Sequence, residues 1–274
     1  MASLARTVVP LAKATPYSLT ALGRRGLPPR IEVHGQTYTR RRVFKNDFFA
    51  VTALYVGDAG RVILKVHRQV SFLLLSLGWL GRLLAARELA AFNRLRYVEG
   101  VPRLIGRWGS TGLVREYVEG HPLARGERVP DDFHTRLRSL IEAIHERGMA
   151  YVDLEKCENV LVGDDGRPHL FDFQISWYLP PKWGGELWPA RKLRRWFQAG
   201  DRYHLVKLQR RTRPDQLSTE QLAFSYRRPW YVHLHSLLTR PFTWCRRRVL
   251  DRVDPGHKSG ERGRVTDDEV IGAL

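Results

Sequence analysis

The chain has 274 residues, of which 43% are hydrophobic and 27% are charged, a composition typical of a globular protein and not of a disordered or multi-span membrane protein. Its 46 Lys and Arg residues against 28 Asp and Glu residues give a net charge of +18, which attracts nucleic acid, anionic lipid headgroups or phosphorylated substrates. The two cysteines, Cys157 and Cys245, fit neither a disulfide framework nor a metal-ligand spacing, so we expect a reducing compartment.

The first 30 residues contain basic side chains but no continuous apolar core of signal-peptide length, because Pro10 and Pro16 interrupt it. We therefore expect an N-terminal extension at residues 1–30 without a cleaved secretion signal. Extended patterns follow at residues 38–44, 48–56 and 61–67, and "GDAG" joins the last two as a hairpin turn. These patterns predict a three-stranded antiparallel sheet.

Thirteen uncharged residues, Gln69–Gly81, come next and are too few for the ~20 residues that span a bilayer. They form either a buried helix or a helix in contact with lipid, and Trp79 and the flanking arginines favour an interface. Apolar side chains then predict a helix over residues 82–98, which ends before Gly100. Two short strands are expected at residues 103–109 and 112–118.

An amphipathic helix is predicted from Phe133 to Ile144, capped by Asp131 or Asp132. Beyond it, the apolar runs "NVLV" and "PHLFDF" flank the turn signal "GDDG" and predict a tight hairpin. Acidic and amide side chains surround this hairpin: Asp153, Asn159 and Asp172. Carboxylates beside an amide suit magnesium, and a carboxylate a few residues before the amide could accept the proton of an attacking hydroxyl.

Five motifs occur in a fixed order along the chain: "VILKV" at Lys65, "AARELAAF" at Glu88, "YVDLEKCEN" from Asp153 to Asn159, "FDFQ" at Asp172 and "GDRYHLVKL" at Asp201. In order and expected secondary structure they resemble the protein kinase-like superfamily, especially small atypical bacterial members related to lipopolysaccharide core kinases and RIO-like Ser/Thr kinases. The resemblance covers roughly residues 37–208.

The resemblance implies an α+β, two-lobed protein kinase-like fold. The N-lobe, an antiparallel sheet plus a helix, would occupy residues 31–118, and a shortened, mostly helical C-lobe residues 119–215. A basic aromatic extension would follow at residues 216–274.

ATP and Mg2+ are the cofactors that the resemblance implies. Lys65 would hold the α/β-phosphates with Glu88 as its ion-pair partner, and the backbone from Glu116 to Val118 would bind the adenine. Asn159 and Asp172 would hold the metal.

The same resemblance makes Asp153 the catalytic base, lets Lys156 reach the transferred phosphate, and makes Asp201 the support of the catalytic loop. Four features depart from the pattern of typical kinases. Tyr151 and Val152 replace His-Arg, Asn159 lies one residue further from Asp153 than usual, and Gln174 replaces the glycine of D-F-G. The glycine-rich loop is absent from "FKNDFFAV", so the backbone would cradle the phosphates more loosely or the chain would use Lys45 and Asn46 instead.

The function predicted from this resemblance is ATP- and magnesium-dependent phosphate transfer to a hydroxyl of a protein Ser/Thr or of a lipid-linked sugar. The alternative is a membrane-docked pseudokinase that binds without transfer. Residues 182–213 combine many basic side chains with three tryptophans, which indicates either a solvated charged face or a surface for anionic lipid or a phosphosugar. Nucleic acid is disfavoured because no recognition motif is present. The expected location is cytoplasmic, peripheral on the cytoplasmic face of the membrane.

Overall fold

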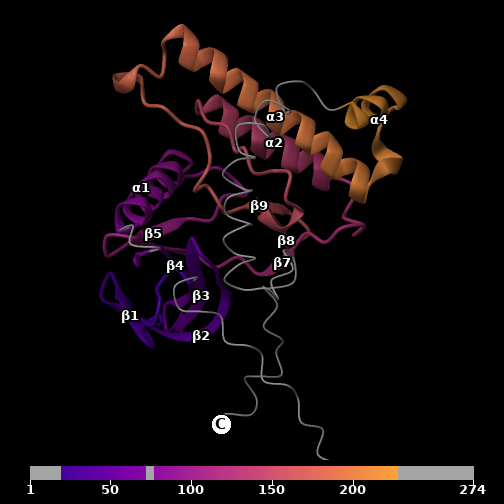
Figure 1. The fold of residues 1–274 in the computed structure, drawn as a ribbon. Coiled ribbons are helices and arrows are strands. Elements are labelled where there is room, and N and C mark those ends of the chain that lie inside the picture. The colour runs from indigo at the N-terminus through magenta and orange to yellow at the C-terminus, as the bar shows by residue number, and fades with distance from the viewer. Residues whose placement is uncertain (1–19, 72–76, 228–274) are drawn as a thin grey trace, which may run out of the picture.

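The computed structural model describes residues 20–71 and 77–227, which form two lobes with a strand-rich and a helix-rich character (Figure 1). The first lobe contains a six-stranded antiparallel sheet in the order β1-β2-β3-β4-β6-β5. Its strands are β1 (Arg30–Val33), β2 (Gln36–Asn46), β3 (Ala50–Gly57), β4 (Gly60–His67), β5 (Leu104–Trp108) and β6 (Gly112–Glu116). The three strands expected between residues 38 and 67 are confirmed as β2, β3 and β4.

Strand β1 was not predicted from the sequence. It pairs with β2, and the His34 side chain beyond it contacts the Ile105 carbonyl oxygen of β5 at 2.8 Å, which curls the sheet toward its other edge. Leu22 and Leu27, which precede β1, are buried in the core of this lobe. Residues 20–30 therefore pack onto the sheet.

Helix α1 (Gly78–Arg94) begins and ends four residues earlier than predicted, so its first turn lies in the uncharged run. The early start depends on Gly81, because a Cβ atom built there would lie 1.9 Å from the Arg68 carbonyl oxygen. Residues 72–76 of the run lie outside the described residues, and Trp79 is 56% exposed. Within the described part of the chain, no helix combines the length and the apolarity needed to cross a bilayer.

The second lobe contains a small antiparallel sheet and three helices. The sheet has the order β7 (Gly120–Pro122), β8 (Val160–Gly163), β9 (Pro168–Leu170), so the predicted hairpin is present as β8 and β9. The helices are α2 (Phe133–Glu146), α3 (Trp188–Thr212) and α4 (Thr219–Tyr226), with short 3-10 turns at Cys157–Asn159, Pro181–Trp183 and Pro214–Gln216.

Helix α2 begins where the sequence predicts, but not by side-chain capping. Asp132 occupies the N-cap position in a helical conformation, and its carboxylate accepts a hydrogen bond from Arg136 at 2.6 Å and makes no cap hydrogen bond. The capping prediction is wrong because the arginine one turn later competes for the carboxylate.

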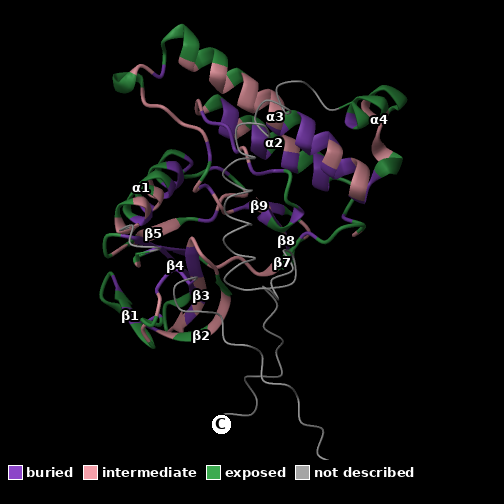
Figure 2. Cartoon of the chain, in the orientation of Figure 1, coloured by how far each residue is buried: buried purple, intermediate pink, exposed green. Residues whose placement is uncertain are grey.

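The main apolar core joins α2 to α1, β8 and the C-terminal half of α3 through residues such as Phe92, Leu137, Ile141 and Leu205. Figure 2 shows this concentration of buried residues on α2 and on the adjoining part of α3. The expected extension at residues 216–274 is described as far as residue 227, where the ring of Phe224 on α4 packs against Tyr203 on α3. Its remaining basic aromatic part and Cys245 lie outside the described residues.

Candidate active site

Lys65 lies on β4 between two neighbouring strands, where it pairs in register with Thr52 and Leu113. Its side chain is almost completely removed from water, so the ammonium requires a charged partner. Glu88 on α1 supplies it: the Lys65 Nζ atom lies 2.9 Å from the Oε1 atom of a fully buried carboxylate. The β4 register and the α1 face that carries Glu88 therefore create one buried ion pair.

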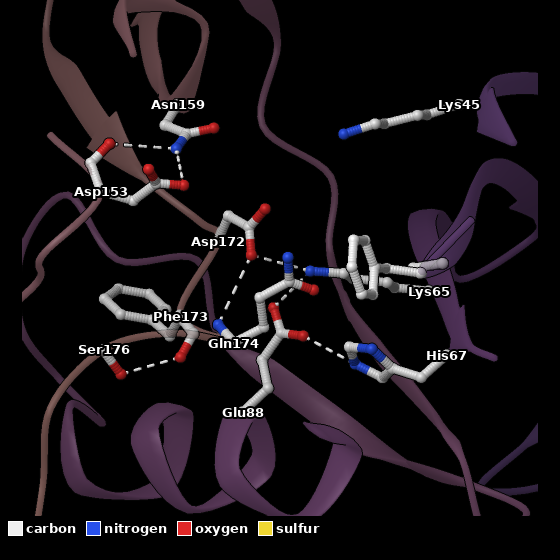
Figure 3. A network of polar contacts seen from close by, with 12 residues as sticks. Lys45, Lys65, His67, Glu88, Asp153, Asn159, Asp172, Phe173, Gln174 and Ser176 are labelled. Atoms are coloured by element: carbon white, nitrogen blue, oxygen red, sulfur yellow. Dashed lines mark hydrogen bonds and ion pairs between the residues drawn. The ribbon is translucent and has the colours of Figure 1, made fainter. Parts of the chain in front are cut away.

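Asp172, just after β9, joins this pair from the second lobe. The Lys65 Nζ atom lies 3.0 Å from the Asp172 Oδ1 atom (Figure 3). Burial opposes the charge on Lys65, but the carboxylates of Asp172 and Glu88 outweigh it and raise the pKa of the lysine. Burial likewise favours a protonated Asp172, but Lys65 outweighs it and lowers the pKa of the aspartate. Both groups are consequently charged at neutral pH.

The segment before β8 brings Asp153, Lys156 and Asn159 together. The Asp153 Oδ2 atom accepts hydrogen bonds from Lys156 Nζ at 2.7 Å and from Asn159 Nδ2 at 2.8 Å. Asn159 also donates to the backbone oxygen of Asp153 at 3.1 Å, so the intervening loop is closed on itself. Burial raises the pKa of Asp153 despite the opposing effects of Lys156 and Asn159. A carboxylate with this raised pKa is a better proton acceptor than an exposed aspartate.

Asp201 on α3 lies beneath this loop and is 1% exposed. Its carboxylate accepts hydrogen bonds from the backbone nitrogens of Tyr151 at 2.8 Å and Val152 at 2.7 Å, and from His145 Nε2 at 2.9 Å. Val152 has a φ of 73°, in the left-handed region that β-branched residues avoid. The bonds to Asp201 hold this strained conformation and thereby the position of Asp153.

The donor set near Asp172 fits a magnesium ion. Asn159 bonds Asp153 through its amide nitrogen, which leaves the amide oxygen for a metal, and Asp172 bonds Lys65 through only one carboxylate oxygen. In Figure 3, Asp172 lies between Asn159 and Lys65. No cluster of three or more His, Cys, Asp and Glu side chains suited to a metal occurs in residues 20–71 and 77–227. Two protein oxygens are nevertheless enough for magnesium, which retains waters and binds substrate phosphates.

The segment expected to bind adenine lies between the lobes. Glu116 ends β6, and its backbone nitrogen donates to the Arg103 carbonyl oxygen at 2.9 Å. Val118 is two residues further, in the connection to β7. Among the described residues, neither one makes a side-chain hydrogen bond to Lys65, Asp153 or Asp172, so the adenine prediction depends on the position of the backbone alone.

The connection between β2 and β3 has a turn held by Asp47 in place of glycines. The Asp47 Oδ1 atom accepts from the backbone nitrogens of Phe49 and Ala50, both at 2.9 Å. Lys45 forms an ion pair with Asp47 at 3.0 Å, and its charge contributes to the lowered pKa of Asp172. In Figure 3 Lys45 extends toward the space beside Asp172. A cation thus faces the site from the position where typical kinases have glycines.

Sequence reasoning missed His67 and Arg115. His67 is fully buried, and its Nε2 atom donates to Glu88 Oε2 at 2.9 Å, so Glu88 is held by Lys65 and His67 together. The β4–β6 register places Arg115 on the same face of the sheet as Lys65. Burial lowers the pKa of Arg115 to about 10, and its guanidinium packs over the Phe171 ring at 5.0 Å. The alternation of β4 and β6 could have placed both residues on the face of Lys65, but not their contacts with Glu88 and Phe171.

Asp172 is followed by a segment that the core holds in place. The Phe173 ring packs edge-on against Phe92 and Tyr151 at 5.2 and 5.5 Å. The Arg87 side chain of α1 donates to the Ser176 carbonyl oxygen at 2.9 Å. With Gln174 between them, Phe173 and Ser176 hold Asp172 toward Lys65.

Comparisons with known proteins bear on the fold. No family model and no curated protein matches the sequence. Among solved structures, the Rio2 kinase-ADP/Mg2+-phosphoaspartate complex from Chaetomium thermophilum is similar with a TM-score of 0.50 at 20% identity, over 67% of this chain and 59% of that chain. The Rio2 kinase from the same organism has a TM-score of 0.50 at 19% identity, over 67% of this chain and 61% of that chain.

The chain accordingly has the α+β, protein kinase-like fold predicted from the sequence. The match spans about three fifths of the length of the two Rio2 kinases. The narrower resemblance to lipopolysaccharide core kinases and the individual roles of the site residues stay predictions.

Proposed function

We propose that this chain with a protein kinase-like fold is an ATP- and magnesium-dependent phosphotransferase whose acceptor is an alcohol group. The observation that carries the proposal is the connected network of Lys65 with Glu88 and Asp172, formed across the two lobes beside Asp153. Phosphoryl transfer demands positioning and charge neutralisation more than covalent chemistry by the protein, and this network supplies both. The magnesium and ADP of the Rio2 complex support the choice of cofactors.

Each polar group has a role in the proposed reaction. Lys65, held by Glu88, would bind the α/β-phosphates, while Asp172 and Asn159 would hold the magnesium. The bound metal would supply neutralisation of phosphate charge. Asp153 would orient the acceptor hydroxyl and accept its proton as the hydroxyl oxygen bonds to the γ-phosphorus and ADP leaves. Lys156, 2.7 Å from Asp153, would contact the transferred phosphate.

The proposed acceptor is either a protein Ser/Thr or a lipid-linked sugar. Exposed basic and aromatic side chains after Asp172, such as Trp183 and Lys192, support an anionic or membrane-bound acceptor. The proposed location is cytoplasmic, peripheral on the cytoplasmic face of the membrane, because ATP is supplied there and buried Cys157 forms no disulfide within the described residues.

The test is radiolabel transfer from ATP by the purified full chain, followed into protein and into extracted lipid. We expect magnesium-dependent transfer by the wild type and loss of transfer in Asp172→Ala, because the metal ligand is removed. Asp153→Ala should also lose turnover but keep its affinity for ATP, which separates the base from the nucleotide site. Full activity of either variant would refute the role given to that residue, and the labelled fraction would identify the acceptor class.

One observation favours a second candidate, a membrane-docked pseudokinase. The β2–β3 connection contains no glycine and is closed by Asp47, so it lacks the backbone cradle that a glycine-rich loop gives to phosphates. Gln174 in place of the D-F-G glycine agrees with this reading. Absence of transfer, together with no stabilisation of the fold by magnesium and ATP, would favour the pseudokinase.

A further inference from the structure

The N-terminal half of α3 has no buried residue between Trp188 and Gly200, whereas buried positions begin at Asp201. Figure 2 shows the same division, with exposed and intermediate residues at the end of α3 that lies away from α4. The helix therefore extends beyond the core that stabilises its second half. Exposed apolar side chains on the N-terminal half of α3 therefore require an explanation other than core packing.

Trp188, Lys192 and Trp196 follow one another at intervals of four residues and lie along one face of α3. The Lys192 ammonium lies 5.9 Å from the centre of the Trp188 ring and 5.4 Å from that of Trp196. This face points away from the side on which Leu205 and Leu208 are buried in the core. The two indoles and the lysine thus form one ordered outer stripe.

The chain before α3 adds two more apolar side chains to this end of the molecule. Trp183, in the 3-10 turn, is 70% exposed, and Leu187, at the N-cap position, is 64% exposed. Trp188 itself is 74% exposed. We call Trp183, Leu187, Trp188, Lys192 and Trp196 the indole patch.

The charge around the indole patch is strongly positive. Residues 182–200 contain five basic side chains, Lys182, Arg191, Lys192, Arg194 and Arg195, and a single acidic one, Glu186. Arg194 pairs with Glu186 at 3.2 Å, which leaves the other cations without an acidic neighbour in this segment. Basic side chains beside exposed indoles combine attraction to anionic headgroups with a preference for the boundary between headgroup and acyl chain.

We infer that the indole patch is a docking surface for the interface of an anionic lipid bilayer. A solvated charged face would explain the arginines but not three large apolar side chains that are each more than half exposed. The apolar content of the indole patch also exceeds what phosphate contacts with nucleic acid require.

The segment that follows Asp172 connects the active site to the indole patch. The segment between Asp172 and the indole patch is anchored at Ser176 by Arg87 and at Trp177 by backbone pairing with Ala150. A bilayer that binds the patch would therefore contact the chain that continues from this anchored segment. A role of the patch in phosphate transfer to a membrane-bound acceptor rests on the proposed function, whereas lipid binding itself does not.

The test is sedimentation of the full chain with vesicles of phosphatidylcholine alone or with added phosphatidylglycerol, at low and high salt. The variant is Trp183→Ala combined with Trp188→Ala. The matched control is Tyr97→Asn, which removes a 90% exposed aromatic ring from a left-handed backbone position that Asn tolerates. Neither change touches the core, so melting temperatures should be equal.

We expect the wild type and Tyr97→Asn to pellet with anionic vesicles and to be released by salt, and the double variant to partition roughly tenfold less. Equal pelleting of the double variant and the wild type would overturn the inference, as would pelleting by neither. Binding of the wild type to a single-stranded RNA but not to vesicles would also overturn it, in favour of nucleic acid. The assay contains no nucleotide, so its failure is distinct from failure of phosphate transfer.

Discussion

Glu88 is the residue on which the buried charges of the site depend. Two donors from β4 hold its carboxylate, Lys65 at 2.9 Å and His67 at 2.9 Å, and all three side chains are largely or fully removed from water. A buried carboxylate with two charged or polar donors keeps one orientation, because loss of either donor leaves an oxygen unsatisfied. His67 is therefore expected to position Glu88, and through it Lys65.

Replacement of His67 tests this dependence. His67→Phe keeps a ring but removes the donor to Glu88, so we expect the free energy of unfolding to fall by about 1–3 kcal/mol and the affinity for magnesium and ATP to weaken. His67→Gln retains an amide donor and should recover part of both. Urea denaturation and nucleotide titration of the two variants are the measurements. Equal unfolding free energies and equal nucleotide affinities of His67→Phe and His67→Gln would show that His67 contributes only packing.

The lowered pKa of Asp172 predicts that the free energy of unfolding depends on pH. Its folded-state pKa lies below the ordinary value of 3.8, because the attraction of Lys65 outweighs burial. A lowered carboxyl pKa contributes stability that is present above that ordinary value and is lost as pH falls through the folded-state pKa. As the pH falls below 3.8, Asp172→Asn should therefore lose less stability than the wild type. The comparison requires urea denaturation at a series of pH values, and parallel curves for the two proteins would contradict it.

At the scale of elements, α1 matters because it carries Glu88 to β4 and Arg87 to the second lobe. Its position depends on close contact between Gly81 and the backbone of Arg68. Burial within the helix follows the same face, at Ala85, Glu88 and Phe92. A displacement of the first turn would thus change the site as well as the packing.

Substitution of glycine in α1 tests that contact. Gly81→Ala places a methyl group 1.9 Å from the Arg68 carbonyl oxygen, so the backbone must shift, and we expect a loss of about 1–3 kcal/mol. Gly78→Ala is the matched control, since the nearest atom would lie 3.7 Å from its methyl group and alanine favours a helix. Thermal unfolding of both variants should separate them, and similar melting temperatures would exclude tight packing at Gly81.

The β2–β3 connection shows how one element can be built without its usual residues. Asp47 accepts two backbone hydrogen bonds and thereby closes the turn, while Lys45 carries a charge toward Asp172. Proximity of a lysine would replace part of the attraction that backbone nitrogens of a glycine-rich loop give to phosphates.

At the scale of the whole molecule, the two lobes meet through polar contacts as well as through the core. Lys65 joins Asp172 at 3.0 Å, and Arg94 of α1 donates to the Tyr178 hydroxyl at 2.9 Å. Both contacts link the N-lobe to the segment after β9. A ligand that binds between Lys65 and Asp172 would consequently act on the stability of both lobes.

Magnesium and ATP should therefore stabilise the whole fold if the proposed site binds them. A ligand specific for the native state at one hundred times its Kd contributes about 2.7 kcal/mol, which is a shift of several degrees in the melting temperature. Removal of magnesium with a chelator should abolish most of the shift, and Asp172→Ala should show little. No shift in the wild type under saturating conditions would count against nucleotide binding.

Strands β2 to β6, the β8–β9 hairpin, helices α1 and α2 and the order of the site residues could be predicted from the sequence, because they depend on local patterns. Alternation identified β2, β3 and β4, three-and-four spacing identified α2, and turn residues identified the β8–β9 hairpin. The motifs around Lys65, Glu88, Asp153 and Asp172 were recognisable for the same reason: each lies in one short segment. The kinase-like fold followed from their order.

Contacts between distant segments were decided only by the tertiary structure. His67 and Arg115 gained their relation to Glu88 and Asp172 from the packing of α1 and the pairing of β4 with β6, which no local pattern contains. The early start of α1 depends on a close approach to Arg68, and the edge strand β1 depends on a partner. The sequence indicated a solvated or lipid-binding surface at residues 182–213, but only the tertiary structure shows that the first half of α3 lies outside the core.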